Sequence, residues 1–379
     1  MKTGIAILPL HYGTTPRWLF ERMKKLGKAI ASLIIREYGS FELLKRIADP
    51  FWFQAFGCTL GFDWHSSGLT TVTCGALKEA LREAAKENEI NIGIAGGKGK
   101  AAKKTLAEIE NKACELNLTT KKIERLIYAS RMAAKVDSAV LQDMHELYHH
   151  TFIFTVDGRW AVIQQGMDIA ERTARRYHWL SENVESFVNE AETILSQIKH
   201  RSVLDMRAEK SEEARKCCLD LIREKPTKLK KELEKIRRES QKTLDEWLNT
   251  TNIETQKEKE AIKVLRMPRR INWKVVKALY EFQPKNYEEL ISFEGVGPSL
   301  VRALALISAL IYGNEPSWKD PVKYSFAVGG KDGVPFPVNK KVMDKSIAIL
   351  EDGIKEAELG KKEKLLALKR LKWFVENSR

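Results

Sequence analysis

Residues 151–164 read Thr-Phe-Ile-Phe-Thr-Val-Asp-Gly-Arg-Trp-Ala-Val-Ile-Gln, and this stretch decides the fold. On each side of Asp157-Gly158 lies a run of β-branched and aromatic residues, which is typical of strands. Asp-Gly is favoured in the two-residue turns of β-hairpins, where the central residues take positive φ angles. The stretch therefore predicts a β-hairpin, and the rest of the chain is read outward from it.

Helical periodicity dominates on both sides of this hairpin. Apolar residues recur at helical spacing from Trp18 to Tyr38, with Pro16 before them and Gly39 after them. Further helices are expected at 41–47, 70–87, 105–117, 119–148 and 168–179. Residues 90–95 alternate like a short strand. The expected fold class is mostly α with a small β component, one hairpin plus short strands.

Changes in composition divide the chain into three expected units. Residues 1–185 are rich in Gly, His and Trp and predict a mainly helical candidate catalytic domain with the β-hairpin. Residues 186–270 are helical and charged, which is typical of a linker or a small bundle. Residues 271–379 predict a DNA-binding domain with a C-terminal helix, for the reasons given below.

The charge balance favours a polyanionic partner. The chain of 379 residues has 65 Lys and Arg against 51 Asp and Glu, a net charge of +14. We expect nucleic acid rather than membrane, because no Lys-rich amphipathic helix stands at either end. A basic surface of the kind found in thermophiles explains the charge equally well. The oligomeric state is left open.

Three further features predict a soluble, cytoplasmic protein. Apolar runs such as 304–311 fall well short of the ~20 residues that a membrane helix needs, and residues 1–10 do not form a secretory signal. The five cysteines form no CxxC pair, which fits a reducing compartment.

Residues 289–311 resemble a helix-hairpin-helix, a motif that holds the DNA backbone. In such a motif, Gly295 and Gly297 would allow a tight turn and close approach to a phosphate, and Val296 would pack between the helices. Amide groups at the start of the second helix, near Ser299, would bind the phosphate oxygen, and Arg302 would add charge. The alternative is an ordinary corner between two helices. Other candidate DNA contacts are Arg175, Arg176 and Lys98.

The chain after this motif offers candidate catalytic residues. In helix-hairpin-helix DNA glycosylases a catalytic aspartate follows the glycine turn by roughly two dozen residues, and here Asp320 lies 25 residues after Gly295 (320 − 295). Lyase members of that superfamily carry lysine at the position of Ser299, so a lyase would need another amine. Lys331 and Asp332 stand in a Gly-rich loop that would place a cation and a carboxylate together, although such loops are also plain turns.

The first unit holds a second group of candidates. Asp63 and His65 combine an acid with a base, as general acid–base chemistry requires. An extruded base would fit a pocket formed by Trp52, Phe53 and Trp64. If the protein is a nuclease, the expected ligands of a divalent metal are Asp63, His65, His145 and His149. His145 and His149 would share one face of a helix, although ordinary core or surface histidines are the more common explanation of such a pair.

Five blocks of the sequence resemble an uncharacterised family called domain of unknown function seven hundred and sixty-three. They are residues 8–20, 62–71, 158–167, 176–181 and 325–333. The resemblance implies a distribution mainly in archaea and thermophilic bacteria, and no function. The chain departs from the family pattern at Val328, where a His is usual, and at Ala191-Glu192, where a Pro-His pair is usual.

Three functions remain open at this point. The first is a DNA-repair enzyme that excises a damaged base from double-stranded DNA, a DNA glycosylase with or without lyase activity, which needs no cofactor. The second is a DNA nuclease that depends on a divalent metal. The third is a DNA-binding protein without enzymatic activity.

Overall fold

The computed structural model describes most of the chain outside its two ends. The described residues are 15–62, 67–86, 90–171, 173–189, 193–195, 202–236, 267–268, 270–322, 348, 352, 355 and 364–371.

An antiparallel sheet of five strands forms the middle layer, in the order β1-β3-β4-β5-β6. The strands are β1 (Ile92–Lys98), β3 (Glu146–Thr155), β4 (Trp160–Asp168), β5 (Thr173–Leu180) and β6 (Thr193–Leu195). The predicted hairpin is confirmed as β3–β4, with Phe154 opposite Trp160. Gly158 has a φ of 93°, which explains why the turn needs glycine.

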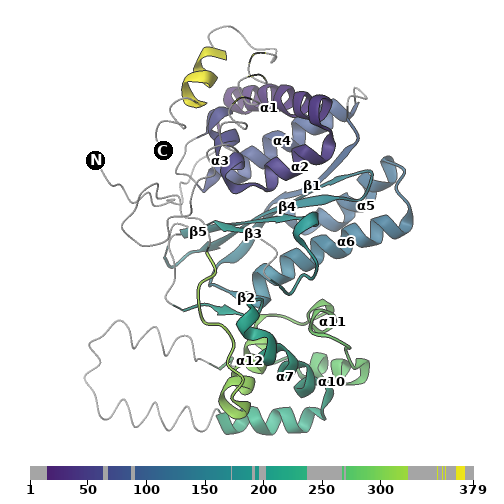
Figure 1. Ribbon diagram of the computed structural model, residues 1–379, viewed down its shortest axis with the longest axis vertical. Helices are drawn as coiled ribbons and strands as arrows, with labels where there is room; N and C mark the ends of the chain where they lie inside the picture. The colour runs from purple at the N-terminus through teal and green to yellow at the C-terminus, as the bar shows by residue number, and fades with distance from the viewer. Residues whose placement is uncertain are drawn as a thin grey trace, which may run out of the picture.

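Helices cover both faces of the sheet, as Figure 1 shows. Four N-terminal helices lie on one face: α1 (Arg17–Tyr38), α2 (Ser40–Ala48), α3 (Pro50–Thr59) and α4 (Gly68–Lys86). On the other face lie α5 (Thr105–Glu115) and α6 (Thr120–Lys135). Successive residues of β3 point to opposite faces, so Ile153 packs among the N-terminal helices while Phe152 and Phe154 pack beneath α5 and α6.

Further helices pack at the C-terminal end of α6 (Figure 1). They are α7 (Glu212–Arg223), α10 (Trp273–Phe282), α11 (Tyr287–Ser292) and α12 (Pro298–Tyr312). A small ladder of β2 (Leu141–Gln142) and β7 (Leu204–Asp205) lies between them and the large sheet. Residues 226–236 and 364–371 are also helical. None of the helices in these described stretches is long and apolar enough to cross a membrane.

The fold class is confirmed as mostly α with a small antiparallel sheet, but two expected helices are wrong. The helix expected at 168–179 is strand β5, and the helix expected at 119–148 ends at Lys135. A short π-helix, Val136–Val140, follows, and the chain then enters β2 and β3. Strand β5 misleads because polar and aromatic residues are buried on both of its faces, so that no apolar–polar alternation marks it.

The three expected units share one hydrophobic cluster. In the range expected as a linker, the described residues include β6, β7 and α7. Cys218 and Leu221 of α7 belong to the same cluster as Met132 of α6 and Leu304 of α12. The helices at the C-terminal end are therefore packed directly onto the sheet-bearing part of the molecule.

Candidate functional site

A tight turn joins α11 to α12 and presents its backbone to solvent. Gly295 has a φ of 82°, in the left-handed region that favours glycine. Val296 is buried and belongs to the large hydrophobic cluster, whereas Gly295 and Ser299 are exposed. The turn is thus anchored by one apolar side chain and leaves the backbone on either side of it accessible.

The 15-residue helix α12 begins at this turn with Pro298 in its first turn and Gly297 as its N-cap residue. No side chain caps this end, so the amide groups of the first turn are not covered by a capping side chain. A β-carbon added to Gly297 would meet no atom within 4 Å. The start of α12 therefore combines helix-dipole charge with open space, as an anion contact requires.

Polar side chains from α6 and β2 fix the turn in place. Lys135 donates hydrogen bonds to the carbonyl oxygens of Ile291, at 2.7 Å, and Phe293. Gln142 donates to the carbonyl oxygen of Pro298 at 2.9 Å and accepts a 2.8 Å bond from Nε of Arg302. Burial lowers the pKa of Lys135 to about 8. Both ends of the turn are therefore held by the neighbouring layer.

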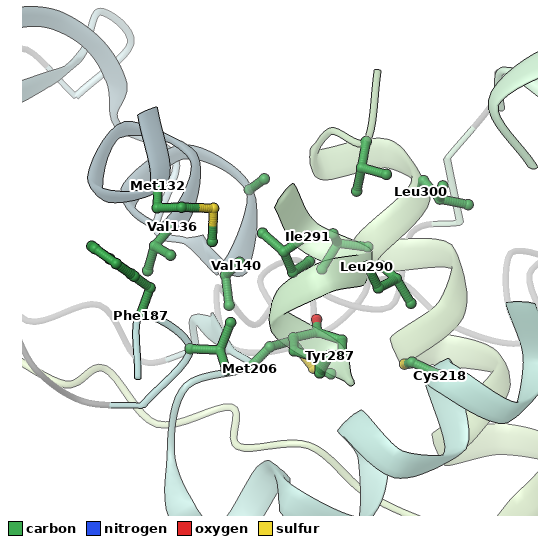
Figure 2. Packing of buried hydrophobic residues seen from close by; sticks show 14 of the residues in the cluster. Met132, Val136, Val140, Phe187, Met206, Cys218, Tyr287, Leu290, Ile291 and Leu300 are labelled. Carbon is green, nitrogen blue, oxygen red and sulfur yellow. The ribbon is translucent and has the colours of Figure 1, made fainter. Parts of the chain in front are cut away.

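Apolar packing supports these bonds. Figure 2 shows Met132, Val136 and Val140 on one side of the interface and Leu290 and Ile291 on the other. The start of α11 is also tied down, because Glu288 accepts hydrogen bonds from the Tyr128 hydroxyl at 2.9 Å and from the Phe187 amide at 3.0 Å. These contacts make α6 the support of the α11–α12 pair.

Arg302, expected as a phosphate contact, also makes a contact within the protein. Its guanidinium is half-buried, bonds to Gln142, and has its pKa lowered by burial. Because Gln142 in turn donates a hydrogen bond to the carbonyl oxygen of Pro298, Arg302 stabilises the turn indirectly, through Gln142.

Arg175 and Asp320 form a buried ion pair. Nη2 of Arg175 lies 2.5 Å from Asp320, and Nη1 lies 3.1 Å from Asp143, with all three side chains at most 1% exposed. The Tyr177 hydroxyl donates to Asp143 at 2.8 Å. Burial alone would raise the pKa of Asp143, but the charge of Arg175 and the hydrogen bond from His145 together lower it. The expected DNA contact and the expected catalytic acid instead tie the segment after α12 to strand β5.

Arg176 is also buried, on the other face of β5. It donates to the side-chain oxygen of Gln54 at 2.9 Å and to Nε2 of His178 at 2.8 Å, and it lies over the ring of Phe53. Burial lowers the pKa of Arg176 to about 9 and that of His178 well below its usual value. In this structure neither arginine faces solvent, because Arg175 binds Asp143 and Asp320 while Arg176 points among the N-terminal helices.

The expected base pocket is not formed by its two described members. Trp52 and Phe53 are 1% and 0% exposed, and Trp52 stacks on Phe56 with ring centroids 4.9 Å apart. Both side chains fill the core beneath the N-terminal helices. The third member, Trp64, lies outside the described residues.

The expected histidine pair does not share a helix face. His145 precedes β3 and contacts the Thr173 hydroxyl at 3.1 Å, whereas His149 lies in β3 and contacts the Thr151 hydroxyl at 3.0 Å. Burial lowers the pKa of His149 to about 3. Within the described ranges no three His, Cys, Asp or Glu side chains are grouped to hold a metal ion.

Several other expected residues lie outside the described ranges or on the surface. Asp63, His65, Lys331, Asp332, Val328 and Ala191-Glu192 are not among the described residues. Lys98 is exposed at the end of β1, with its amine 5.9 Å from the ring centroid of Tyr148.

Three of the sequence blocks meet at the face of the sheet that α4 covers. Gln165 of β4 donates to the carbonyl oxygen of Ser67 at 2.9 Å, and Arg176 of β5 donates to the Thr70 hydroxyl at 3.4 Å. Ser67 directly follows the Asp63–Ser66 segment in sequence. Residues from these three blocks are therefore neighbours in space.

A buried polar chain around Asp137 was not expected from the sequence. Oδ2 of Asp137 accepts hydrogen bonds from Gln164, at 2.5 Å, and from the Trp179 indole, at 2.8 Å. The Gln164 side-chain oxygen is 2.8 Å from Nδ1 of His150, whose Nε2 is 2.8 Å from the Ser130 hydroxyl. Burial raises the pKa of Asp137 to about 8. Its one sequence signal is an acidic residue amid apolar ones, which does not reveal partners on distant strands.

Comparison with known proteins gives a family and no function. No curated protein and no solved structure matches the chain. The family described as "Protein of unknown function (DUF763)" matches residues 4–338, most of the sequence and all of the large sheet. The chain therefore belongs to this family.

Proposed function

We propose that this protein is a DNA-repair enzyme that holds double-stranded DNA by its phosphate backbone and excises a damaged base. The observation that carries the proposal is the turn at Gly295–Gly297, which we interpret as a helix-hairpin-helix. It combines a buried anchor, Val296, with an uncapped helix start and open space at Gly297. Such a site binds a phosphate without reading the base sequence.

The surroundings of the turn favour an anionic ligand. The whole chain has a net charge of +14. Arg131 is exposed on α6, one helical turn before Lys135, and its charge contributes to the lowered pKa of Lys135. Arg131 therefore supplies a solvent-facing cation beside the bonds that hold the turn, and we propose it as a second phosphate contact.

The chemistry of excision requires an acid that activates water or stabilises a cationic sugar. We keep Asp63, His65 and Asp332 as candidates for this role on their residue types, with Lys331 as the amine if strand scission accompanies excision. Asp320 is no longer preferred, because its carboxylate is occupied by Arg175 inside the molecule. We propose that base excision proceeds without a metal cofactor.

Incubation with duplexes that each contain one kind of damaged base tests the proposal. The products are resolved as abasic sites or nicked strands, with and without a chelator, and borohydride is added to trap an imine. We expect an abasic site or a trapped complex in the presence of chelator. Nicking that a chelator abolishes would show a metal-dependent nuclease instead. Binding without any change of the DNA would leave a protein that binds DNA but is no enzyme.

A further inference from the structure

A pocket of about 590 Å³ lies between α6, the start of β4 and the segment that follows β5. Its walls include Tyr128 of α6, Trp160 of β4, and Val184 and Phe187 from the segment after β5. This volume lies within the usual range for small-molecule sites. None of the residues singled out in the sequence as a base pocket contributes to it.

The aromatic wall of the pocket is firmly held. The rings of Trp160 and Phe187 are stacked at 5.8 Å with an interplanar angle of 6°, and Trp160 also stacks on Phe152 at 5.7 Å. The Tyr128 ring meets Phe187 edge-on at 5.8 Å. An aromatic guest would enter a preformed apolar site, at a low cost in side-chain ordering.

The rim of the pocket is polar and mainly cationic. Lys121 and Arg125, one helical turn apart on α6, are exposed at the rim together with Glu124. Cations at the mouth of an aromatic pocket suit a guest that carries a phosphate outside and a flat ring inside. Glu124 supplies an acceptor for amino groups on such a ring.

The pocket and the glycine turn are connected by α6. Tyr128 lines the pocket and donates to Glu288 at the start of α11, while Lys135, seven residues later, holds the end of α11. Seven residues correspond to about 10 Å along a helix, which equals about three base-pair steps along the axis of duplex DNA. One strand can therefore be near both sites.

We propose that this pocket receives a single nucleobase extruded from DNA that the glycine turn holds, with Lys121 and Arg125 at its flanking phosphates. The inference rests on the proposed DNA grip. Extrusion exposes one base at a time, and a nucleobase with its backbone phosphate matches the aromatic wall and cationic rim. The predicted contact is thus to the base itself, beyond the backbone contact at the turn.

A duplex with 2-aminopurine opposite an abasic site reports extrusion, because the emission of this base changes when it leaves the stack. The variant Val184→Trp would fill the pocket, and Ile169→Trp places the same side chain at an exposed position in the β4–β5 turn. We expect the wild type and Ile169→Trp to change the emission at least two-fold. Val184→Trp should lose that change while its affinity, measured by anisotropy, stays within about three-fold.

Variants that reverse charges at the rim test the same proposal without filling the pocket. Lys121→Glu with Arg125→Glu should also lose the emission change, whereas Lys86→Glu, on the exposed end of α4, should keep it. A full emission change in folded Val184→Trp and in the double variant would overturn the pocket assignment, and so would tight binding by the wild type with no change of emission. No binding of any duplex by the wild type would instead overturn the proposed function.

Discussion

Asp137 shows how one residue inside the sheet layer responds to pH. It is fully buried, and Oδ1 has no hydrogen-bond partner among the described residues. Burial raises the pKa of its carboxyl to about 8, so the folded protein holds a proton there that the unfolded chain releases at an ordinary carboxyl pKa. Proton binding by this group therefore favours folding in acid, and the contribution is lost as pH rises towards 8.

Replacing Asp137 with asparagine should remove this pH dependence. Between about pH 5 and about pH 8, the wild type should lose stability relative to Asp137→Asn, because only the wild-type chain must take up a proton at this position in order to fold. Urea unfolding of both proteins at the two pH values measures the difference. If the two proteins differ in their free energy of unfolding by the same amount at both pH values, Asp137 does not titrate in this range.

Asp320 should be needed for stability more than for chemistry. Removing Asp320 leaves the buried Arg175 paired with Asp143 but takes away its hydrogen bonds to the second carboxylate, so Asp320→Ala should lower the free energy of unfolding by about 1–3 kcal/mol. Asp220→Ala, at an exposed position of α7 where the side chain is 76% exposed, is the control and should change it by less than about 0.5 kcal/mol. Full stability of Asp320→Ala with loss of activity would restore Asp320 as a candidate catalytic acid.

At the scale of elements, the glycine turn separates two residues that look equivalent in the sequence. A β-carbon on Gly295 would lie 2.6 Å from Cγ2 of Val275, at a φ of 82°, while one on Gly297 would meet nothing within 4 Å. The fold therefore requires glycine at position 295. It does not require glycine at position 297, so glycine there must have another reason. Close approach of a ligand is such a reason.

The same substitution at the two positions should have unequal effects. Gly295→Ala should lower the free energy of unfolding by about 1–3 kcal/mol because of backbone strain and the contact with Val275. Gly297→Ala should change it by less than about 0.5 kcal/mol. Chemical denaturation of the two variants checks this, and equal losses would mean that the turn has another conformation.

Elements with a regular local pattern of apolar and turn residues could be predicted from the sequence. Elements with both faces buried could not. The β3–β4 hairpin and helix α1 follow from turn chemistry and helical periodicity, which are local. Strand β5 was expected to be helical, because its alternating faces carry Arg175 and Arg176 into two different buried layers. Its polar residues are satisfied by partners distant in sequence, and no local pattern reveals such partners.

The candidate site was predictable to the same extent. Gly295–Gly297 was found because a turn is a local signal, and the structure has a tight turn there. The aromatic pocket was missed because Tyr128, Trp160 and Phe187 come from three segments that only the packing of α6 and the segment after β5 against the sheet brings together. Lys135 and Gln142 were missed for the same reason, since their partners lie more than 150 residues away.

At the scale of the whole molecule, the α11–α12 pair is part of one packed body with the sheet. Glu288, Lys135 and Gln142 bind across this junction, and the hydrophobic cluster runs through it (Figure 2). A ligand held at the turn is therefore held in a fixed position relative to the pocket on α6. The account depends on the turn being where DNA is held.

The most direct test is a fluorescence titration of Gly297→Val with two unrelated duplexes at several salt concentrations. Tyr312→Val, at the exposed far end of α12, is the control, and both variants must unfold at the wild-type temperature. We predict that Gly297→Val weakens binding to both duplexes by a similar factor, because a side chain there blocks a backbone contact that is independent of sequence. The slope of log affinity against log salt should stay close to the wild-type value, because the turn contacts phosphate through uncharged amide groups and not through Lys or Arg. Unchanged affinity of folded Gly297→Val for both duplexes would contradict the account.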